Sequence, residues 1–210
     1  MLIFLAERLA FLATPKTGST AVEMALRSRA DVIFARSRKH IPAQRYDARV
    51  APFVEATFGV RPESCAVMRE PVEQLRSWYR YRRRDEKDGT PQSTKNLSFD
   101  DFVLAALRDD PPEFARVGRQ FSFLCNSRGK CMVDHLFAYE APAGFLDFLG
   151  ARFGEIPVLE RRNVSPDVPA ELSAQVAARL RAGRADDFAL YERLQKAGGY
   201  LSRDRHPATT

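Results

Sequence analysis

One short segment of this sequence combines the residue types that bind phosphate groups. Residues 14–20 read Thr-Pro-Lys-Thr-Gly-Ser-Thr, in which a lysine stands among several hydroxyl side chains. The ammonium group of Lys16 carries a full positive charge, and the hydroxyls of Thr17, Ser19 and Thr20 can donate hydrogen bonds to anionic oxygens. The segment therefore indicates an anion-binding loop of the kind that holds a phosphate.

The elements expected on either side of the loop favour the same interpretation. Residues 9–13 form an apolar run that is long enough for a buried strand and too short for a helix. Because Pro15 lacks a backbone N–H and Gly18 permits backbone angles closed to other residues, the chain is expected to turn tightly here. A helix can begin at Ser19, with Ser19 or Thr17 as its cap. A strand, a tight loop and a helix N-terminus present unpaired N–H groups to an anion.

Two familiar phosphate-binding patterns are not met. The Walker P-loop, G-x-x-x-x-G-K-[ST], places its lysine directly before the Ser/Thr that holds magnesium, whereas Lys16 stands two residues before Gly18. The dinucleotide fingerprint fails because Gly18 stands alone. An ATP-dependent P-loop kinase or NTPase is kept as the alternative function. It would also need an acidic residue at the end of a strand, where Met68 leads into Arg69 instead.

A second segment places a positive charge at the end of another buried strand. Residues 64–68 are expected to form the strand, with Arg69 at its carboxyl end, and a helix is expected from Pro71 to about Arg84. Ser77 lies about two turns along this helix. Open α/β sheets bind ligands at the carboxyl ends of their strands. A guanidinium and a hydroxyl together suit a terminal phosphate monoester.

Both segments resemble cofactor-binding motifs of sulfotransferases. Residues 15–20 (P-K-T-G-S-T) are similar to the 5′-phosphosulfate loop P-K-[TS]-G-[ST]-[ST], which follows the first core strand of these enzymes. Residues 69–79 are similar to their 3′-phosphate motif R-x-P-x-x-x-x-x-S-x-Y. Residues 136–140 resemble a strand-ending Y-E of the family. Residues 159–166 resemble the late L-x-x-x-N-x-S segment of the carbohydrate-type (family 2) sulfotransferases.

The resemblance implies an enzyme that moves a sulfuryl group from 3′-phosphoadenosine 5′-phosphosulfate (PAPS) to a hydroxyl or amine acceptor without a metal. It assigns the 5′ end of the cofactor to Lys16, Thr17, Gly18, Ser19 and Thr20, and the 3′-phosphate to Arg69 and Ser77. Arg161, Arg162 and Asn163 would close over the nucleotide. The acceptor would be a small molecule, a glycan or a lipid headgroup, and the sequence does not indicate which, nor an oligomeric state.

The expected chemistry requires charge stabilisation and a general base. Lys16 would stabilise the charge that develops on the departing phosphate oxygen. Of the three histidines, His40 follows a predicted strand at the catalytic edge of the sheet, whereas His135 lies within a strand and His206 in the tail. His40 is therefore the predicted base. Glu23, on the first helix, is the alternative.

Composition limits the remaining classes. The 210 residues carry a net charge of +6 and are 45% hydrophobic, which favours anionic ligands, but no nucleic-acid recognition motif is present. No apolar run is long enough to span a membrane and no secretory signal is recognised, so a cytoplasmic location is expected. Three cysteines without a C-x-x-C pattern support neither a disulfide framework nor a zinc site. The basic residues Arg76, Arg80, Arg83 and Arg84 could recognise an acidic acceptor such as a glycan or an anionic lipid headgroup, but a solvated helix face is the commoner explanation of such a run, and no site role is assigned to them.

Strands that alternate with helices predict an α/β fold, a single P-loop-like domain with a mainly parallel central sheet flanked by helices. The domain is expected to cover residues 1–201, followed by a loose tail at 202–210. Strands are expected at residues 2–6, 9–13, 31–35, 64–68, 121–125 and 131–139. Helices are expected at residues 19–29, 43–58, 71–84, from 98 onward, and at 142–153, 170–181 and 186–197.

Overall fold

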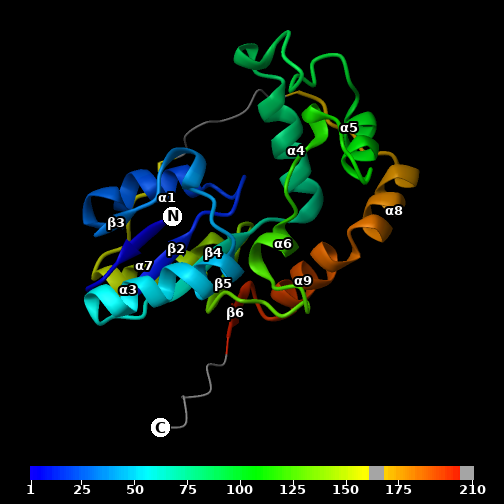
Figure 1. Ribbon diagram of the computed structural model, residues 1–210. Helices are drawn as coiled ribbons and strands as arrows, with labels where there is room; N and C mark the ends of the chain where they lie inside the picture. Colours follow the sequence, from blue (N-terminus) through cyan, green and yellow to red (C-terminus); the bar gives the residue numbers. More distant parts are fainter. Residues whose placement is uncertain (161–167, 204–210) are drawn as a thin grey trace.

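Six short strands form one sheet at the centre of the fold (Figure 1). The computed structural model describes residues 1–160 and 168–203, and within them the strand order is β3-β1-β2-β4-β5-β6. The strands are β1 (Leu2–Phe4), β2 (Leu9–Leu12), β3 (Val32–Ile33), β4 (Glu63–Met68), β5 (His135–Ala138) and β6 (Tyr200–Ser202).

The sheet is mixed, which corrects the prediction of a mainly parallel one. β2, β4 and β5 run parallel to one another. β1 pairs antiparallel with both β2 and β3, and β6 pairs antiparallel with β5. β1 and β2 form a hairpin, and a tight connection of this kind reverses the chain direction. The predicted α/β class, with a central sheet flanked by helices, is confirmed.

Nine α-helices lie in the described residues. They are α1 (Ser19–Leu26), α2 (Ala43–Arg45), α3 (Ala51–Phe58), α4 (Pro71–Arg82), α5 (Phe99–Ala106), α6 (Gln120–Leu124), α7 (Pro142–Phe153), α8 (Ala174–Gly183) and α9 (Ala185–Lys196). A π-helical turn, Tyr46–Val50, joins α2 to α3. Pro52 has no N–H to donate, so the helical ladder predicted over 43–58 is interrupted there.

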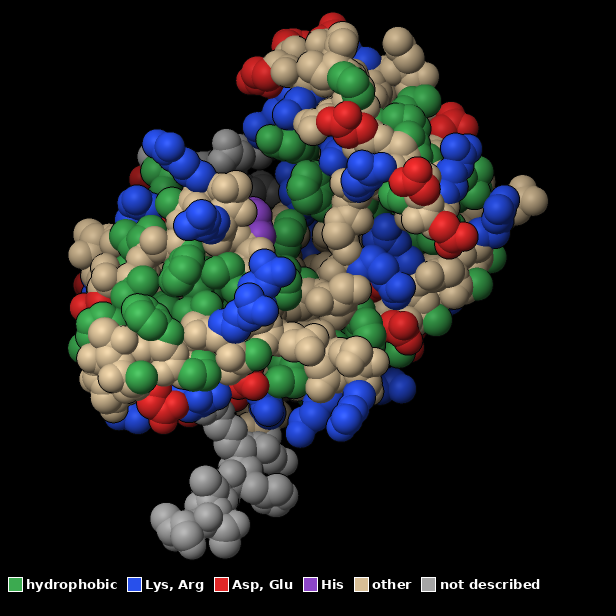
Figure 2. Space-filling view, viewed as in Figure 1, with side chains coloured by type: hydrophobic (Ala, Val, Ile, Leu, Met, Phe, Trp, Pro, Cys, Tyr) green, Lys and Arg blue, Asp and Glu red, His purple; other side chains and the backbone are tan. Residues whose placement is uncertain are grey.

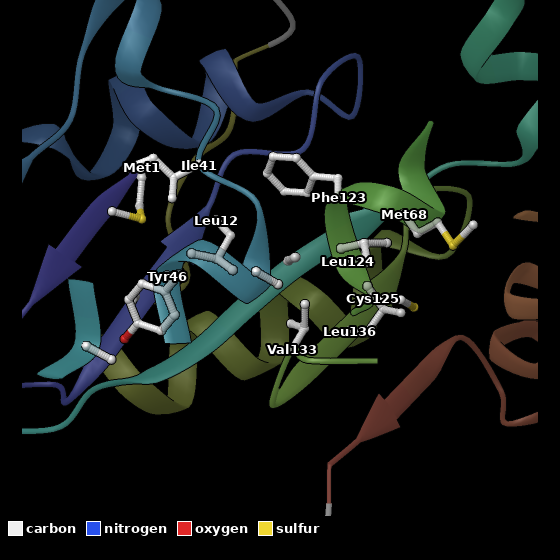
Figure 3. Close-up of a cluster of buried hydrophobic side chains, with 14 of the residues drawn as sticks. Met1, Leu12, Ile41, Tyr46, Met68, Phe123, Leu124, Cys125, Val133 and Leu136 are labelled. Atoms are coloured by element: carbon white, nitrogen blue, oxygen red, sulfur yellow. The ribbon is translucent and has the colours of Figure 1, made fainter. Parts of the chain in front are cut away.

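Alternating side chains of the strands belong to two separate hydrophobic clusters, one on each face of the sheet. In β2, Leu9 and Phe11 point to the face covered by α1 and α7. Ala10 and Leu12 point to the opposite face, covered by α2, α3, α6 and α9. Figure 3 shows this second cluster, where Leu12 and Leu136 of the sheet meet Tyr46 and Leu124 of the helices. This period of two is what a sheet buried on both faces requires.

A third hydrophobic cluster holds a helical lobe beside the sheet. Residues of α4, α5, α8 and α9 build it, and its largest members include Tyr79 and Phe102. In Figure 1, α4, α5 and α8 lie together to one side of the strands. Ser98 caps α5 in a capping box with Asp101. We call this group of helices the helical lobe.

Two local predictions are wrong. Residues 121–125 form most of α6 rather than a strand, and only Cys125 makes an isolated antiparallel bridge, to Cys131. The helix is held by contacts distant in sequence, among them the bond from Phe121 N–H to Asp187 Oδ1 at 2.9 Å. Ser202, expected to begin a loose tail, is the last residue of β6. Residues 204–210 lie outside the described residues.

The helices of the described residues include none that is both long and apolar enough to cross a membrane.

Candidate functional site

The three parallel strands end at one edge of the sheet, and the predicted anion-binding residues follow two of them. Leu12 of β2 lies beside Ala66 of β4, and Met68 of β4 lies beside Ala138 of β5. The loop with Lys16 follows β2, Arg69 follows β4, and Tyr139 follows β5. Parallel strands bring their carboxyl ends to a common edge, so these three segments converge.

A cavity of about 1000 Å³ opens at this edge, between the sheet and the helical lobe. Figure 2 shows the molecule hollowed between these two parts, with Lys and Arg side chains along the hollow. Apart from Glu23, the alternative base, every site residue predicted within the described part of the chain lines the cavity: Lys16, Thr17, Gly18, Ser19, Thr20, His40, Arg69 and Ser77. Arg162 and its neighbours Arg161 and Asn163 lie outside the described residues.

The loop between β2 and α1 turns through two left-handed residues. Gly18 has a φ of 72° and Lys16 a φ of 68°, a conformation that a lysine seldom adopts. Thr17 Oγ1 donates to the carbonyl of Thr14 at 2.9 Å and fixes the turn. Gly18, not the predicted Ser19 or Thr17, caps α1, and no side chain bonds the first N–H groups of the helix. These donors therefore stay available at the cavity.

Gly18 also lets the loop approach the end of β5. A Cβ atom at this position would lie 3.3 Å from the Tyr139 ring. That ring supports Arg69, whose guanidinium carbon lies 4.7 Å from its centroid. The absence of a side chain at residue 18 is therefore part of what places Arg69 next to the loop.

The ammonium group of Lys16 lies beside two aromatic rings of α4. Lys16 Nζ is 4.1 Å from the Tyr81 ring centroid and 5.2 Å from that of Trp78. Burial, together with the nearby Arg84, Arg69 and Arg82, lowers the pKa of Lys16 to about 8. No carboxylate of the described residues pairs with Lys16. A cation crowded by other cations in this way favours an anion beside it.

Arg69 is fixed through its backbone by Gln120, a buried residue at the start of α6. Gln120 Oε1 accepts from the Arg69 N–H at 2.9 Å, and Gln120 Nε2 donates to the Arg69 carbonyl at 2.7 Å. The Arg69 guanidinium reaches the loop, because Arg69 Nη1 donates to the carbonyl oxygen of Lys16 at 3.4 Å. The other terminal nitrogen, Arg69 Nη2, pairs with Glu73 Oε2 at 3.7 Å. Arg69 Nε is buried without a hydrogen-bond partner. The guanidinium thus keeps an unused donor beside the loop.

The basic run on α4 divides between structural and cavity-facing residues, which corrects its interpretation as a solvated face. Arg76 Nε donates to the carbonyl of Ala170 at 3.0 Å, and Arg82 Nη2 donates to that of Arg116 at 3.1 Å. These bonds hold the helical lobe together. Arg80 and Arg84, with Ser77, line the cavity. The wall of the cavity opposite the loop is therefore positively charged.

His40 presents one ring nitrogen as a proton acceptor. Its Nδ1 lies 2.6 Å from the carbonyl oxygen of Ala13. Because a carbonyl only accepts, Nδ1 carries the proton, and Nε2 of the neutral ring keeps its lone pair. Burial lowers the pKa of His40 below its ordinary value, and the charge of Lys39 adds to this effect, while the bond to Ala13 opposes it. A neutral imidazole at neutral pH is the state that a general base requires.

Glu23, the alternative base, is engaged elsewhere. Its Oε2 pairs with Lys39 Nζ at 2.8 Å, and its Oε1 pairs with Arg27 at 3.0 Å. Burial raises its pKa, but the bond from Lys39 and the charges of Lys39, the N-terminus and Arg27 together outweigh burial and lower the pKa overall. Lys39 Nζ also donates to Thr20 Oγ1 at 3.2 Å. Glu23 is absent from the cavity lining, so it is better placed to hold Lys39 than to take a proton.

Sequence reasoning missed several residues of the site. Gln120 directly precedes the segment predicted as a strand, 121–125, and Lys39 directly precedes the predicted base His40; neither was assigned a role in the site. Tyr139 and Trp78 stand within the quoted motifs, but their packing against Arg69 and Lys16 depends on the fold. In the part of the chain that the structure describes, no three His, Cys, Asp or Glu residues lie together as a metal site.

Comparisons of the chain with protein-family models, with curated proteins and with solved structures found no match. What the cavity binds therefore has to be inferred from its own residues.

Proposed function

We propose that the protein is a PAPS-dependent sulfotransferase with a P-loop-like nucleotide site. The observation that carries the proposal is the convergence of the Lys16 loop and Arg69 on one cavity from neighbouring parallel strands. Two positive groups of this kind suit a nucleotide with phosphate groups at two positions. A volume of about 1000 Å³ is at the upper end of the range of small-molecule pockets.

The residues present fit such a nucleotide. The N–H groups at the start of α1 lack side-chain caps, and Gly18 leaves room where a Cβ would meet Tyr139. Lys16 and the loop hydroxyls would hold the 5′ end, whereas Arg69 and Ser77 would hold the 3′-phosphate. When bound, PAPS supplies the sulfuryl group that is transferred.

The chain's own residues provide the charge stabilisation. Burial and three nearby arginines lower the pKa of Lys16 to about 8. Its ammonium group donates to the oxygen on which negative charge develops. The free N–H groups of the loop add further donors, and the loss of one such donor costs about 2.7–4 kcal/mol of barrier in other enzymes. Tyr81 and Trp78 hold Lys16 and exclude water from one side of it.

His40 removes the proton of the acceptor. The Ala13 carbonyl fixes its tautomer and leaves Nε2 unprotonated, and the lowered pKa keeps the ring neutral near pH 7. Lys39, held by Glu23 and Thr20, opposes protonation of the ring next to it. The acceptor is a hydroxyl or amine compound, in the form of a small molecule, a glycan or a lipid headgroup.

Thermal unfolding with a panel of ligands tests the proposal. We expect 3′,5′-adenosine bisphosphate to raise the Tm without magnesium, and Arg69→Ala to reduce this shift more than the shift given by adenosine 5′-monophosphate. A response only to ATP with magnesium would indicate the alternative, a P-loop kinase or NTPase. A response only to a polynucleotide, or equal losses for both nucleotides in the Arg69 variant, would also overturn the proposal. A mass-spectrometric screen for sulfuryl gain on hydroxyl and amine compounds would then identify the acceptor.

A further inference from the structure

Cys125 and Cys131 oppose each other across an isolated antiparallel bridge beside α6. The neighbouring backbone bonds fix this pairing: Met132 N–H donates to the Leu124 carbonyl at 2.8 Å, and Asn126 N–H donates to the Lys130 carbonyl at 2.9 Å. Because the bonds lie on either side of the cysteines and not between them, the two form a non-hydrogen-bonded pair. Side chains approach each other most closely at such positions.

Hydrogen bonds within the turn that joins the two cysteines fix its course. Asn126 Oδ1 accepts from the N–H groups of both Arg128 and Lys130 at 3.0 Å, and Gly129 takes the left-handed conformation with a φ of 76°. In non-hydrogen-bonded pairs the Cα atoms lie about 4.5 Å apart, and natural disulfides begin at about 4.4 Å. The backbone therefore holds the pair at a separation that a disulfide can bridge, at the short end, where the bridge is more readily reduced.

The two thiols differ in reactivity. Cys125 is buried with 3% of its surface exposed, whereas Cys131 is partly exposed. A hydrogen bond from the Cys125 thiol to the Cys131 sulfur lowers the pKa of Cys131, and the Val133 N–H, Arg193 and Arg203 act in the same direction against burial. The same bond and burial raise the pKa of Cys125, with a further contribution from Asp187 and opposition from Arg193. Cys131 is thus the thiolate that attacks, and Cys125 the thiol that follows.

We propose that Cys125 and Cys131 form a reversible intramolecular disulfide by reaction with a small disulfide oxidant of the glutathione class. The Cys131 thiolate attacks one sulfur of oxidised glutathione, which forms a mixed disulfide and releases one glutathione thiolate. The Cys125 thiol then loses its proton to solvent and attacks the Cys131 sulfur, which forms the internal disulfide and releases the second glutathione. The protein loses two electrons and the oxidant gains them.

The position of the pair connects it to the cavity wall. Cys125 directly follows α6 (Gln120–Leu124), whose first residue bonds the backbone of Arg69 at both its N–H and its carbonyl. The disulfide itself forms whatever the cavity binds, so the test below is independent of the proposed function.

Peptide mapping of the full-length protein tests this inference. The reduced protein is incubated under native conditions with oxidised glutathione, the reaction is stopped with acid, unreacted thiols are alkylated in denaturant, and the chain is digested with trypsin. Trypsin cuts after Arg128 and Lys130, both between the two cysteines, so the peptides that carry Cys125 and Cys131 stay together only when a disulfide joins them. We expect this linked pair and its disappearance after treatment with a thiol reductant. Cys65 is completely buried, so it should not react with glutathione and should be recovered fully alkylated.

Single substitutions check the order of the steps. Cys125→Ser should stop the reaction at a glutathionyl group on Cys131, whereas Cys131→Ser should react at least tenfold more slowly and give no internal link. Cys65→Ser should still form the linked pair. The proposal is overturned if the native protein gives no linked pair, if the pair forms only in denaturant, or if the links join two chains or involve Cys65.

Discussion

Gln120 holds Arg69 by both backbone polar groups, accepting from its N–H at 2.9 Å and donating to its carbonyl at 2.7 Å. A single side-chain amide therefore bonds both backbone polar groups of the residue that directly follows β4. Since Gln120 is 2% exposed, water cannot easily replace these bonds. The orientation of the Arg69 guanidinium toward the Lys16 loop depends on this contact from α6.

Gln120→Ala should destabilise the protein by about 1–3 kcal/mol, because it leaves the N–H and carbonyl of Arg69 without partners. The free energy of unfolding in urea measures this effect. Gln44→Ala is a matched control, because Gln44 lies exposed on α2, where a substitution should change stability by less than about 0.5 kcal/mol. If the two variants lost equal stability, the contact between Gln120 and Arg69 would have no special energetic role.

Gly18→Ala should cost about 1–2 kcal/mol of stability, because the residue has a positive φ. It should also weaken binding of 3′,5′-adenosine bisphosphate, since the new Cβ would crowd the Tyr139 ring that supports Arg69. Gly59→Ala gives the comparison, because Gly59 has a φ of 69° and no atom near the position of a Cβ. Calorimetric titration should show weaker binding only in the Gly18 variant. Unchanged binding in both would exclude the close approach as a determinant of the site.

Binding of the bisphosphate should weaken as the pH rises above 8. The pKa of Lys16 in the free protein is lowered to about 8, and a bound anion stabilises the protonated form. Above that pH, binding must therefore take up a proton, so the affinity falls by at most about tenfold per pH unit. The phosphate groups do not contribute, because their second pKa is about 6. Lys16→Met should bind weakly at all pH values and lose this dependence; a variant that retained it would assign the titration to another group.

Transfer should require neutral His40. Because the pKa of His40 is lowered below 6.5, the rate should fall at lower pH as protonation of Nε2 removes the lone pair. Above that pH the rate should stay constant up to about pH 8, where Lys16 of the free protein begins to lose its proton. His40→Ala should reduce the transfer rate by about 10²–10⁴-fold with nearly unchanged affinity for the bisphosphate. His135→Gln, at a histidine that contacts Tyr200 and Glu63 instead, should keep the pH profile of the unmodified protein. A profile that survives His40→Ala would contradict the assignment.

The sequence predicted the parts of the site that depend on local rules. The turn at residues 14–20 could be predicted because Pro15 lacks a backbone N–H and Gly18 permits backbone angles closed to other residues. The place of Arg69 at the carboxyl end of a strand could be predicted because it follows a run of apolar residues typical of a buried strand. Both sets of residues line the cavity, which follows from the common edge of parallel strands. Their role in binding PAPS stays a prediction.

Contacts between distant segments explain what the sequence did not predict. Residues 121–125 contain alternating phenylalanines, a pattern typical of a strand. Asp187, however, bonds the Phe121 N–H, and Arg69 bonds the side chain of the preceding Gln120, and these distant contacts stabilise a helix. β6 was missed because three residues at the sheet edge carry little pattern and depend on pairing with β5. Lys39 could not be placed, because its bonds to Glu23 and Thr20 join two segments that meet only in the folded chain.

The neighbourhood of Lys16 has a practical consequence for anyone who studies this protein in solution. Trp78 is the single tryptophan of the sequence, and its ring lies 5.2 Å from the Lys16 ammonium. Indole fluorescence responds to nearby charge, so a molecule that draws the lysine away from the ring should change the emission. Ligand binding in the cavity beside Trp78 can therefore be followed by intrinsic tryptophan fluorescence, without an attached dye.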